Sequence, residues 1–345
     1  MSKYICVLLA VVAGLFSGAF SLCAQAPADL PRKVSVGGNM VQHVQGMAID
    51  REKGCLYLSF TNCFLKTDYE GNILASIDSI NGHLGAMTFD ARRRMVYASL
   101  ECKDDEIGRD ISKNLGAREY TQAESVFYIA EIDVDRWTMK RHEVAEATRD
   151  YKKKYGCSGI DGVAVAPAIG GKKGSRLYVA YGIYGDISRT DNDHQVILEY
   201  RLRRLGKPVK KYFVYTGNTN WGVQNMAYDP LTGNLFLAVY KGKKPGFPNY
   251  DLYAVPVNQK PQSRVLKGLE DDGPHLSLEL AAMGVKDPVT GLRGWRFPYG
   301  STGFCTVGDG WWLFAQKTGK KKKQGCRVVL YRWTGNPSNP FETVE

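Results

Sequence analysis

One short pattern, two apolar strands joined by a tight turn, recurs along the chain and constrains the fold more than any other feature. It is clearest in VQGMAIDREKGCLYLSF, HLGAMTFDARRRMVYASLE and VQNMAYDPLTGNLFLAV. Two further copies are GVAVAP followed by RLYVAY, and GFCTVG followed by WWLFAQ. The segments between the strands, such as REKG, LTG and DG, have turn-forming compositions. The sequence therefore predicts five β-hairpins of one kind.

Two more β-rich segments follow each hairpin, so the repeating unit has four strands. The predicted third strands are FLKTDY, VFYIAEID, VILEYRL, YDLYAVPV and RVVLYRW. The predicted fourth strands are ILASID, MKRHEVA, KKYFVY, SRVLKG and FETVE. A four-stranded unit repeated at intervals of roughly 40 to 80 residues is typical of a β-propeller, in which neighbouring blades cover each other's faces.

We therefore expect an all-β fold, a β-propeller with five four-stranded blades. Six blades is the alternative, because residues 270–299 are long enough to contain another strand pair. KVSVG at residues 33–37 is a candidate to pair with the last blade and close the ring.

This order of strands resembles secreted bacterial β-propellers of the broad NHL, YVTN and SMP-30-like kind. The resemblance covers nearly the whole chain after its leader and lies in the construction of the blades. WD40 and Kelch motifs are absent from the sequence. The resemblance implies a propeller and no particular activity, because one fold supports many functions.

The first 26 residues predict a secretory signal peptide, and residues 27–345 a single propeller domain. Lys3 precedes an apolar run at residues 5–20, which is followed by the small residues of SLCAQA. We expect an exported protein, located in the periplasm, at the cell surface or outside the cell. A lipoprotein attached through Cys23 is the alternative. No segment of the mature chain has the length and apolar composition of a transmembrane helix.

Six cysteines follow the leader, and an exported protein can form disulfides. They are Cys55, Cys63, Cys102, Cys157, Cys305 and Cys326. We expect a Cys102–Cys157 disulfide, because the predicted strands bring both residues to the same face of the propeller. Buried free thiols are the alternative.

In each blade, the first strand begins and the second strand ends on the same face of the propeller, here called the loop face. The long predicted loops gather there, and long loops on a rigid scaffold often carry function. Polar residues precede the five first strands, and residues two apart in a strand point the same way. These residues should ring the mouth of the central channel, which is the usual place for a pocket.

Three residues of this ring are predicted to be catalytic. Asp161 is one, because a carboxylate facing a narrow channel needs a cation, an arginine or a proton. His43 and His83 are the others, as proton-transfer groups or ligands. Glu101 is the other acid that the strand order places near the mouth. The alternative for each histidine is a structural role.

A second set of residues is predicted to bind the ligand. Trp221 and Tyr184 could stack on a sugar, Arg189 could hold a carboxylate or phosphate, and Lys241 adds positive charge to the same face. The full set is Gln45, Gln224, Trp221, Asn225, Thr302, Tyr184, Arg189 and Lys241. The structural alternatives are that the polar residues hold water and link neighbouring blades by hydrogen bonds, and that the charged loop residues are simply solvated.

The net charge of +11 favours anionic partners. Together these features predict an exported propeller that acts on an acidic glycan or phosphoester at the channel mouth, as a hydrolase or lyase with or without a metal. The alternative is a non-catalytic propeller of the cell envelope that binds a glycan or a partner protein. A divalent cation such as calcium is the candidate cofactor. Nucleic acid is not expected, because the chain carries a leader and no recognised binding module.

Overall fold

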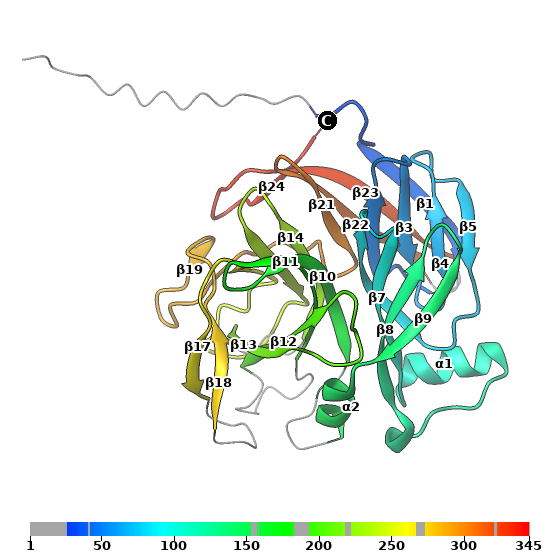
Figure 1. Cartoon of the computed structure of the whole chain (residues 1–345). Helices are drawn as coiled ribbons and strands as arrows, with labels where there is room; N and C mark the ends of the chain where they lie inside the picture. The colour runs from blue at the N-terminus through cyan, green and yellow to red at the C-terminus, as the bar shows by residue number, and fades with distance from the viewer. Residues whose placement is uncertain are drawn as a thin grey trace, which may run out of the picture.

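The structure is a computed structural model in which five twisted sheets stand around a central axis (Figure 1). It describes residues 26–40, 42–152, 157, 159–182, 193–217, 222–266, 273–320 and 323–344. The predicted five-bladed β-propeller is therefore confirmed. In the described part of the chain, no helix has the length and apolar character needed to cross a membrane. Residues 1–25 of the predicted leader lie outside the described residues.

Blades one to three contain the strands that the repeat predicts. Blade one is β2 (Gly46–Asp50), β3 (Cys55–Ser59), β4 (Phe64–Thr67) and β5 (Ile73–Ile77). Blade two is β6 (His83–Asp90), β7 (Met95–Cys102), β8 (Val126–Asp133) and β9 (Thr138–Glu143). Blade three is β10 (Ile160–Ala168), β11 (Lys172–Tyr181), β12 (His194–Arg201) and β13 (Lys210–Tyr215). Every neighbouring pair within these blades is antiparallel.

Blade four corrects one prediction, because it has three strands. They are β14 (Val223–Asp229), β15 (Asn234–Val239) and β16 (Leu252–Pro256). The segment SRVLKG, predicted as its fourth strand, overlaps β17 (Gln262–Val265). β17 pairs with β18 (Pro274–Leu278), which runs parallel to β13 and so extends blade three.

The residues around Trp295, and not β17, occupy the outer edge of β16, and the burial of their side chains gives the physical reason. All four residues of β17 are exposed, so this strand has no apolar face to pack on blade four. Trp295 is buried and stacks on Phe236 with ring centroids 5.8 Å apart. Its backbone exchanges hydrogen bonds with Leu252 of β16. Besides β18, the described residues 273–299 contain the short pair β19 (Val285–Lys286) and β20 (Arg293–Gly294), and they form no sixth blade.

Both ends of the chain close the ring at blade five. This blade contains β21 (Phe304–Gly308), β22 (Trp311–Lys320) and β23 (Lys323–Trp333). Along one edge of β23, β1 (Lys33–Met40) pairs with residues 324–329, and β24 (Phe341–Thr343) pairs with residues 331–333. The predicted pairing of residues 33–37 with the last blade is confirmed.

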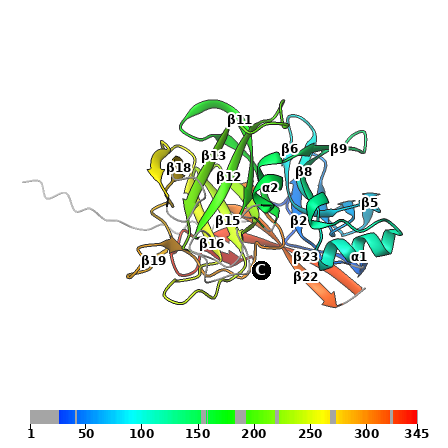
Figure 2. The ribbon, with the colours of Figure 1, turned by 90° about the horizontal axis from the view of Figure 1, so that it is seen from below.

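Short helices interrupt two of the loops, and the sequence pattern did not predict them. They are α1 (Glu106–Leu115), the 3-10 turn η1 (Gln122–Glu124) and α2 (Ala145–Tyr151). The Asp105 side chain caps α1 by accepting a hydrogen bond from Gly108 N at 2.7 Å. Gly116 ends α1 in the left-handed conformation that favours glycine. Figure 2 shows α1 beside blade two.

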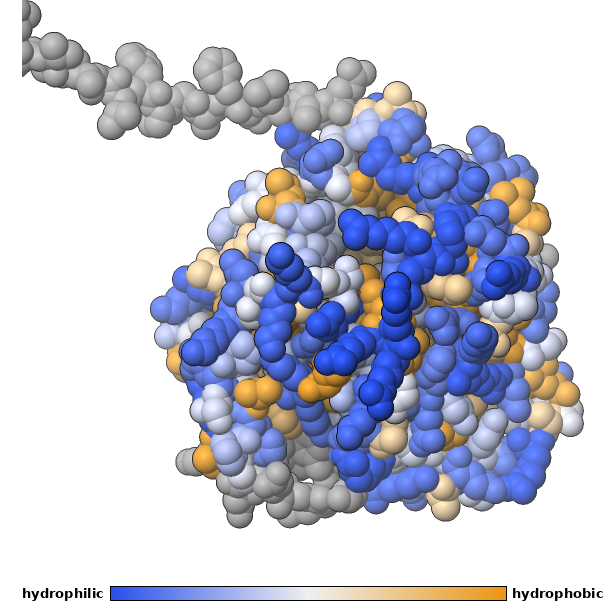
Figure 3. Space-filling model, viewed as in Figure 1, coloured by the Kyte–Doolittle hydropathy of each residue, from blue (hydrophilic) through white to orange (hydrophobic). Residues whose placement is uncertain are grey.

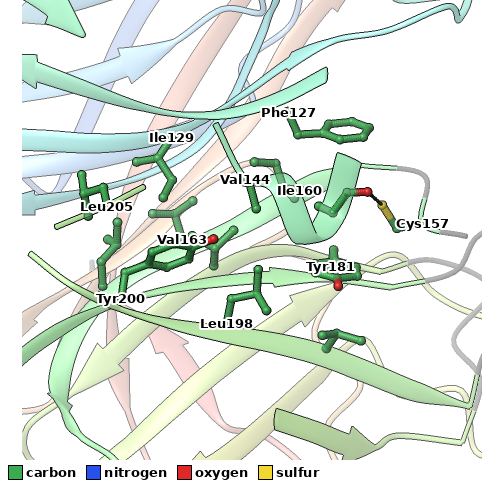
Figure 4. Close-up of a cluster of buried hydrophobic side chains, with 14 of the residues drawn as sticks. Phe127, Ile129, Val144, Cys157, Ile160, Val163, Tyr181, Leu198, Tyr200 and Leu205 are labelled. Atoms are coloured by element: carbon green, nitrogen blue, oxygen red, sulfur yellow. Dashed lines mark hydrogen bonds between the residues drawn. The ribbon is translucent and has the colours of Figure 1, made fainter. Parts of the chain in front are cut away.

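Apolar side chains fill the spaces between blades. In the cluster between blades two and three (Figure 4), Phe127 and Ile129 of β8 share one buried core with Leu198 and Tyr200 of β12. Because each blade buries side chains against its neighbours, no blade has a complete core of its own.

The predicted Cys102–Cys157 disulfide is wrong, since all six described cysteines are free. The Cys102 thiol contacts the carbonyl of Asn81 at 3.4 Å. The Cys157 thiol donates to the carbonyl of Ala147 in α2 at 3.3 Å. Each thiol is thus buried in its own packing environment, as the alternative reading of the sequence allowed.

Glycine stands where the inner strands approach most closely. The first strands β2, β6, β10, β14 and β21 contact one another in sequence around the channel. A Cβ on Gly46 of β2 would collide with the carbonyl oxygen of Gly85 and lie 2.8 Å from the Cα of Ala86, both in β6. The recurring glycine in the sequence repeat is therefore explained by the space that the neighbouring backbone occupies.

We predict that Gly46→Ala lowers the free energy of unfolding of the mature protein by about 1–3 kcal/mol, because the added methyl group pushes β2 and β6 apart. Denaturant titration measures this change. Gly206→Ala is the matched control, since a Cβ at Gly206 meets nothing within 4 Å. Equal effects of the two substitutions would contradict the steric explanation.

Candidate functional site

The two ends of the central channel differ in chemistry. The end opposite the loop face holds a cavity of about 150 Å³, and most of the residues that line it have apolar side chains. Its walls come from all five inner strands and include Ala48, Met87, Val165, Met226 and Phe304. The polar residues predicted from the sequence lie at the other end, where the first strands begin. A ligand that needs polar contacts would therefore meet them at the loop face.

β-Bulges shape the polar end of the channel. The strand register shifts between Leu84 and Met87 in β6, between Ile160 and Gly162 in β10, and between Val223 and Asn225 in β14. A bulge leaves an extra residue outside the ladder and redirects its side chain. In β10 and β14 the extra residues are Asp161 and Gln224, two of the predicted site residues.

The redirected side chains of Asp161 and Gln224 meet. The Gln224 Nε2 atom donates to Asp161 Oδ2 at 3.2 Å. Asp161 Oδ1 lies 3.3 Å from the point where a Cβ on Gly85 would stand, so blade two also reaches this carboxylate. The structure thus brings together three of the positions that the strand alignment placed in one ring.

Glu101 and Lys103 form a buried ion pair beside this carboxylate. Glu101 is 2 % exposed, and its Oε2 atom lies 2.8 Å from Lys103 Nζ and 3.7 Å from His83 Nδ1. Its Oε1 atom accepts a hydrogen bond from Ile160 N at 2.8 Å. The carboxylate occupies space that a Cβ on Gly159 would fill, so the glycine makes room for it.

The charges of this cluster hold one another in the ionised state. Burial opposes ionisation, but Lys103 and His83 keep the pKa of Glu101 below its usual value. Burial also opposes the Lys103 ammonium, yet Glu101, Asp105 and Asp161 raise the pKa of Lys103. Lys103 therefore stays positive at neutral pH and lies in the fields of both Glu101 and Asp161.

His83 has one nitrogen toward Glu101 and the other available. It is 8 % exposed, and in the described part of the structure its Nε2 atom is buried without a hydrogen-bond partner. A carboxylate beside one imidazole nitrogen orients the ring and leaves the other nitrogen for chemistry. Because an unpartnered buried polar atom is costly, Nε2 is a position where a bound ligand would gain a contact.

His43 lies next to His83 and is neutral at physiological pH. Burial, the nearby His83 and Lys317 together lower the pKa of His43 to about 4. Its Nε2 atom lies 2.8 Å from Gln45 Nε2, so the neutral ring accepts a hydrogen bond from the amide. The predicted residues are thus linked only in steps: His43 feels the charge of His83, His83 lies beside Glu101, and Glu101 and Asp161 both act on Lys103.

Two predicted ligand-binding residues have structural contacts. The Asn225 Nδ2 atom donates to the carbonyls of Gln45 at 3.0 Å and Ser301 at 2.9 Å, which ties blade four to blade one and to the approach to blade five. The Thr302 hydroxyl donates to the carbonyl of Ala315 at 2.6 Å. Both arrangements match the structural alternative for these residues.

The remaining predicted residues lie at the rim or outside the described chain. Lys241 is exposed in the segment after β15. Trp221, Tyr184 and Arg189 lie outside the described residues. The roles proposed for these four residues stay predictions.

Sequence reasoning missed Lys103 and Tyr240. Lys103 follows Glu101 at an alternate position at the end of β7, so the spacing Glu-x-Lys could have placed both on one side. Tyr240 follows β15, and burial together with the field of Asp161 raises its pKa to about 12. No sequence pattern marked Tyr240.

The expected divalent cation has no ligand set among the described residues, where no group of three or more histidine, cysteine or acidic side chains is arranged to hold a metal. At the mouth, the Lys103 ammonium already balances the buried Glu101 carboxylate. Asp191 and Asp193 stand at alternate positions in the sequence, a spacing that can indicate calcium ligands, but Asp191 lies outside the described residues.

Comparison with known proteins gives limited information. No family model and no curated protein sequence matches the chain. Among solved structures, it is similar to the GH43_1 enzyme from Xanthomonas citri complexed with xylotriose, at a TM-score of 0.46 and 9% identity over 90% of this chain and 93% of that one. A second structure of that enzyme matches with a TM-score of 0.46 and 8% identity. Similarity this weak carries no argument about activity.

We predict that His43 makes the stability of the protein depend on pH in the acidic range. Its folded pKa of about 4 lies below the ordinary value of 6.5, so the unfolded chain binds the proton more readily. Stability is therefore complete above about pH 6.5 and falls as the pH decreases toward 4. His43→Gln should remove on the order of 2–3 kcal/mol of this loss.

Denaturant unfolding of the parent and His43→Gln proteins between pH 7 and pH 4 measures the difference. The acidic groups common to both proteins cancel in the comparison. Parallel stability curves for the two proteins would contradict the assigned pKa.

Proposed function

We propose that the protein is an exported enzyme that cleaves a glycan at the polar end of its channel. The observation that carries the proposal is His83, whose ring lies beside the buried Glu101 carboxylate while its Nε2 atom has no hydrogen-bond partner in the described structure. An imidazole held in this way has one nitrogen free to serve as a general base. Export follows from the predicted leader and is part of the proposal.

Asp161 is the second group that would contact the substrate in this proposal. It projects from a bulge in β10, accepts a hydrogen bond from Gln224 and lies in the field of Lys103. Asp161 would accept hydrogen bonds from sugar hydroxyl groups. Glu101 would act as a positioning residue, because its carboxylate is buried and already engaged by Lys103 and by Ile160 N.

His83 can support two kinds of bond cleavage. In elimination it takes the proton from the carbon beside a sugar carboxylate, the C–H electrons form a carbon–carbon double bond, and the glycosidic oxygen leaves with the electrons of its bond and takes the proton back from His83. In hydrolysis it takes a proton from water, whose oxygen attacks the sugar carbon as the glycosidic oxygen leaves, and His83 then returns the proton to the leaving oxygen. An acidic glycan is the proposed substrate, because the exposed Lys241 and Lys317 add positive charge near the loop-face rim.

A non-catalytic glycan-binding propeller is the second candidate. The favouring observation is that the polar rim is tied together internally, with His43 on Gln45, Gln224 on Asp161 and Asn225 on two carbonyls. A rim held by its own hydrogen bonds suits rigid recognition without proton transfer.

We predict that His83→Gln reduces glycan cleavage by the mature protein at least a hundredfold, because the amide cannot serve as a base. The substrates to test are polygalacturonate, alginate and xylan. Ultraviolet absorbance of unsaturated products reports elimination, and reducing ends without that absorbance report hydrolysis. His142→Gln is the matched control, since His142 pairs with Glu131 at 2.8 Å in the outer strands of blade two.

Calorimetry with the same three glycans separates the two candidates. Binding that Asp161→Asn weakens, without cleavage by the parent protein, would favour the non-catalytic propeller. Cleavage that survives His83→Gln would remove the proposed base.

A further inference from the structure

A groove lined by arginines lies on the turn face, opposite the loop face. Its volume is about 680 Å³, and it is formed by segments of blades two and three. Arg92 and Arg93 come from the β6–β7 turn, and Arg176 lies near the start of β11. Arg201 ends β12, and Arg203 follows it. Figure 2 shows the β10–β11 hairpin projecting to one side of the disc and the β22–β23 tip to the other.

Two of the five arginines have acidic partners. Arg93 Nε lies 3.4 Å from Asp90 Oδ2, and Arg176 Nε lies 3.1 Å from Glu199 Oε1. Asp90 is the only acidic residue in the groove lining. The groove therefore contains more positive charge than the lining can balance.

The other three arginines, Arg92, Arg201 and Arg203, are exposed and form no ion pair with any described residue. Arg201 also stands directly opposite Arg176 in the β11–β12 ladder. Like charges directly opposite in a sheet are destabilising. A bound anion would relieve this repulsion, so the arrangement gains from a ligand that carries negative charge.

The lining also indicates what kind of anion fits. A guanidinium group binds carboxylate, sulfate or phosphate oxygens in pairs. The lining holds no aromatic residue, so it offers no stacking platform for the bases of a single-stranded nucleic acid. Its one large apolar residue, Leu202, is buried, so nothing in the lining inserts into a lipid surface. Long, strongly hydrophilic side chains cross the middle of the face seen in Figure 3.

We propose that this groove binds a segment of an acidic polysaccharide through successive carboxylate or sulfate groups. Arginines from two blades can contact several charged groups of one chain at once, whereas a single small anion would leave most of the groove unused. This site uses none of the residues at the channel mouth, so it stands or falls separately from the proposed enzymatic activity.

The test is calorimetric binding of polygalacturonate, dextran sulfate and uncharged dextran to the mature protein. The variant Arg92→Gln/Arg201→Gln/Arg203→Gln should bind the polygalacturonate or the dextran sulfate at least tenfold more weakly than the parent. Its affinity should also depend less on salt concentration. The two probes separate carboxylate from sulfate recognition. Uncharged dextran should not bind the parent.

The matched control Arg141→Gln/Lys260→Gln/Lys286→Gln removes the same charge from exposed positions elsewhere, and it should stay within threefold of the parent. Arg203→Gln alone should give an intermediate loss, which guards against misfolding of the triple variant.

Equal losses in the groove and control variants would overturn the proposal, because binding would then depend on net charge alone. Tighter groove-dependent binding of duplex DNA or of phosphatidylglycerol vesicles than of either acidic polysaccharide would also overturn it. Failure of the parent to bind both acidic polysaccharides would have the same meaning.

Discussion

The close approach of the five inner strands is the constraint on which the rest of the structure depends. Where β2 passes β6, the backbone of one strand occupies the place of a side chain on the other, and only glycine at position 46 allows this. Gly162 of β10 and Gly303 before β21 make similar room for Val223 and Met47. The narrow ring that results fixes which residues face the channel. It also forces neighbouring blades to share their apolar cores.

The polar end of the channel shows how a rigid ring can hold charged groups close together. Bulges in β10 and β14 turn Asp161 and Gln224 toward each other, and the end of β7 adds Glu101 and, next to it, Lys103. Each charge is expensive to bury alone, and the ion pair becomes stable because its hydrogen bonds and partners are complete. His83 is the exception, with one buried nitrogen that has no partner in the described structure.

Much of the fold could be predicted from local sequence, because alternating apolar residues and turn compositions are local properties. Which strands pair with each other depends on residues that are distant in the sequence. β17 has the composition of a strand, yet Trp295 covers the edge that it was expected to join, and β17 pairs elsewhere. The helix α1 lies within one of the long loops predicted for the loop face.

For the candidate site, alignment of the first strands found Asp161 and Gln224, which the structure places in contact. The bulges that bring them together shift the register by single residues, and composition carries no sign of that. Lys103 was not predicted because it lies beyond the end of the predicted strand. Cys102 and Cys157 were paired because both were expected at one face, but a shared face does not fix the direction of a thiol.

The shared edge of β23 has a consequence for how the molecule is made. Lys33 pairs with Val329, so the first described strand has no partner until nearly the whole chain has been synthesised. Until then β1 and the growing end of the sheet are open edges, which can pair with strands of other molecules. Joining segments so distant in sequence is slow, since the chain must give up the freedom of nearly its whole length. Ring closure should therefore be the late step of assembly, and the interval before it the period in which the protein is most exposed to aggregation.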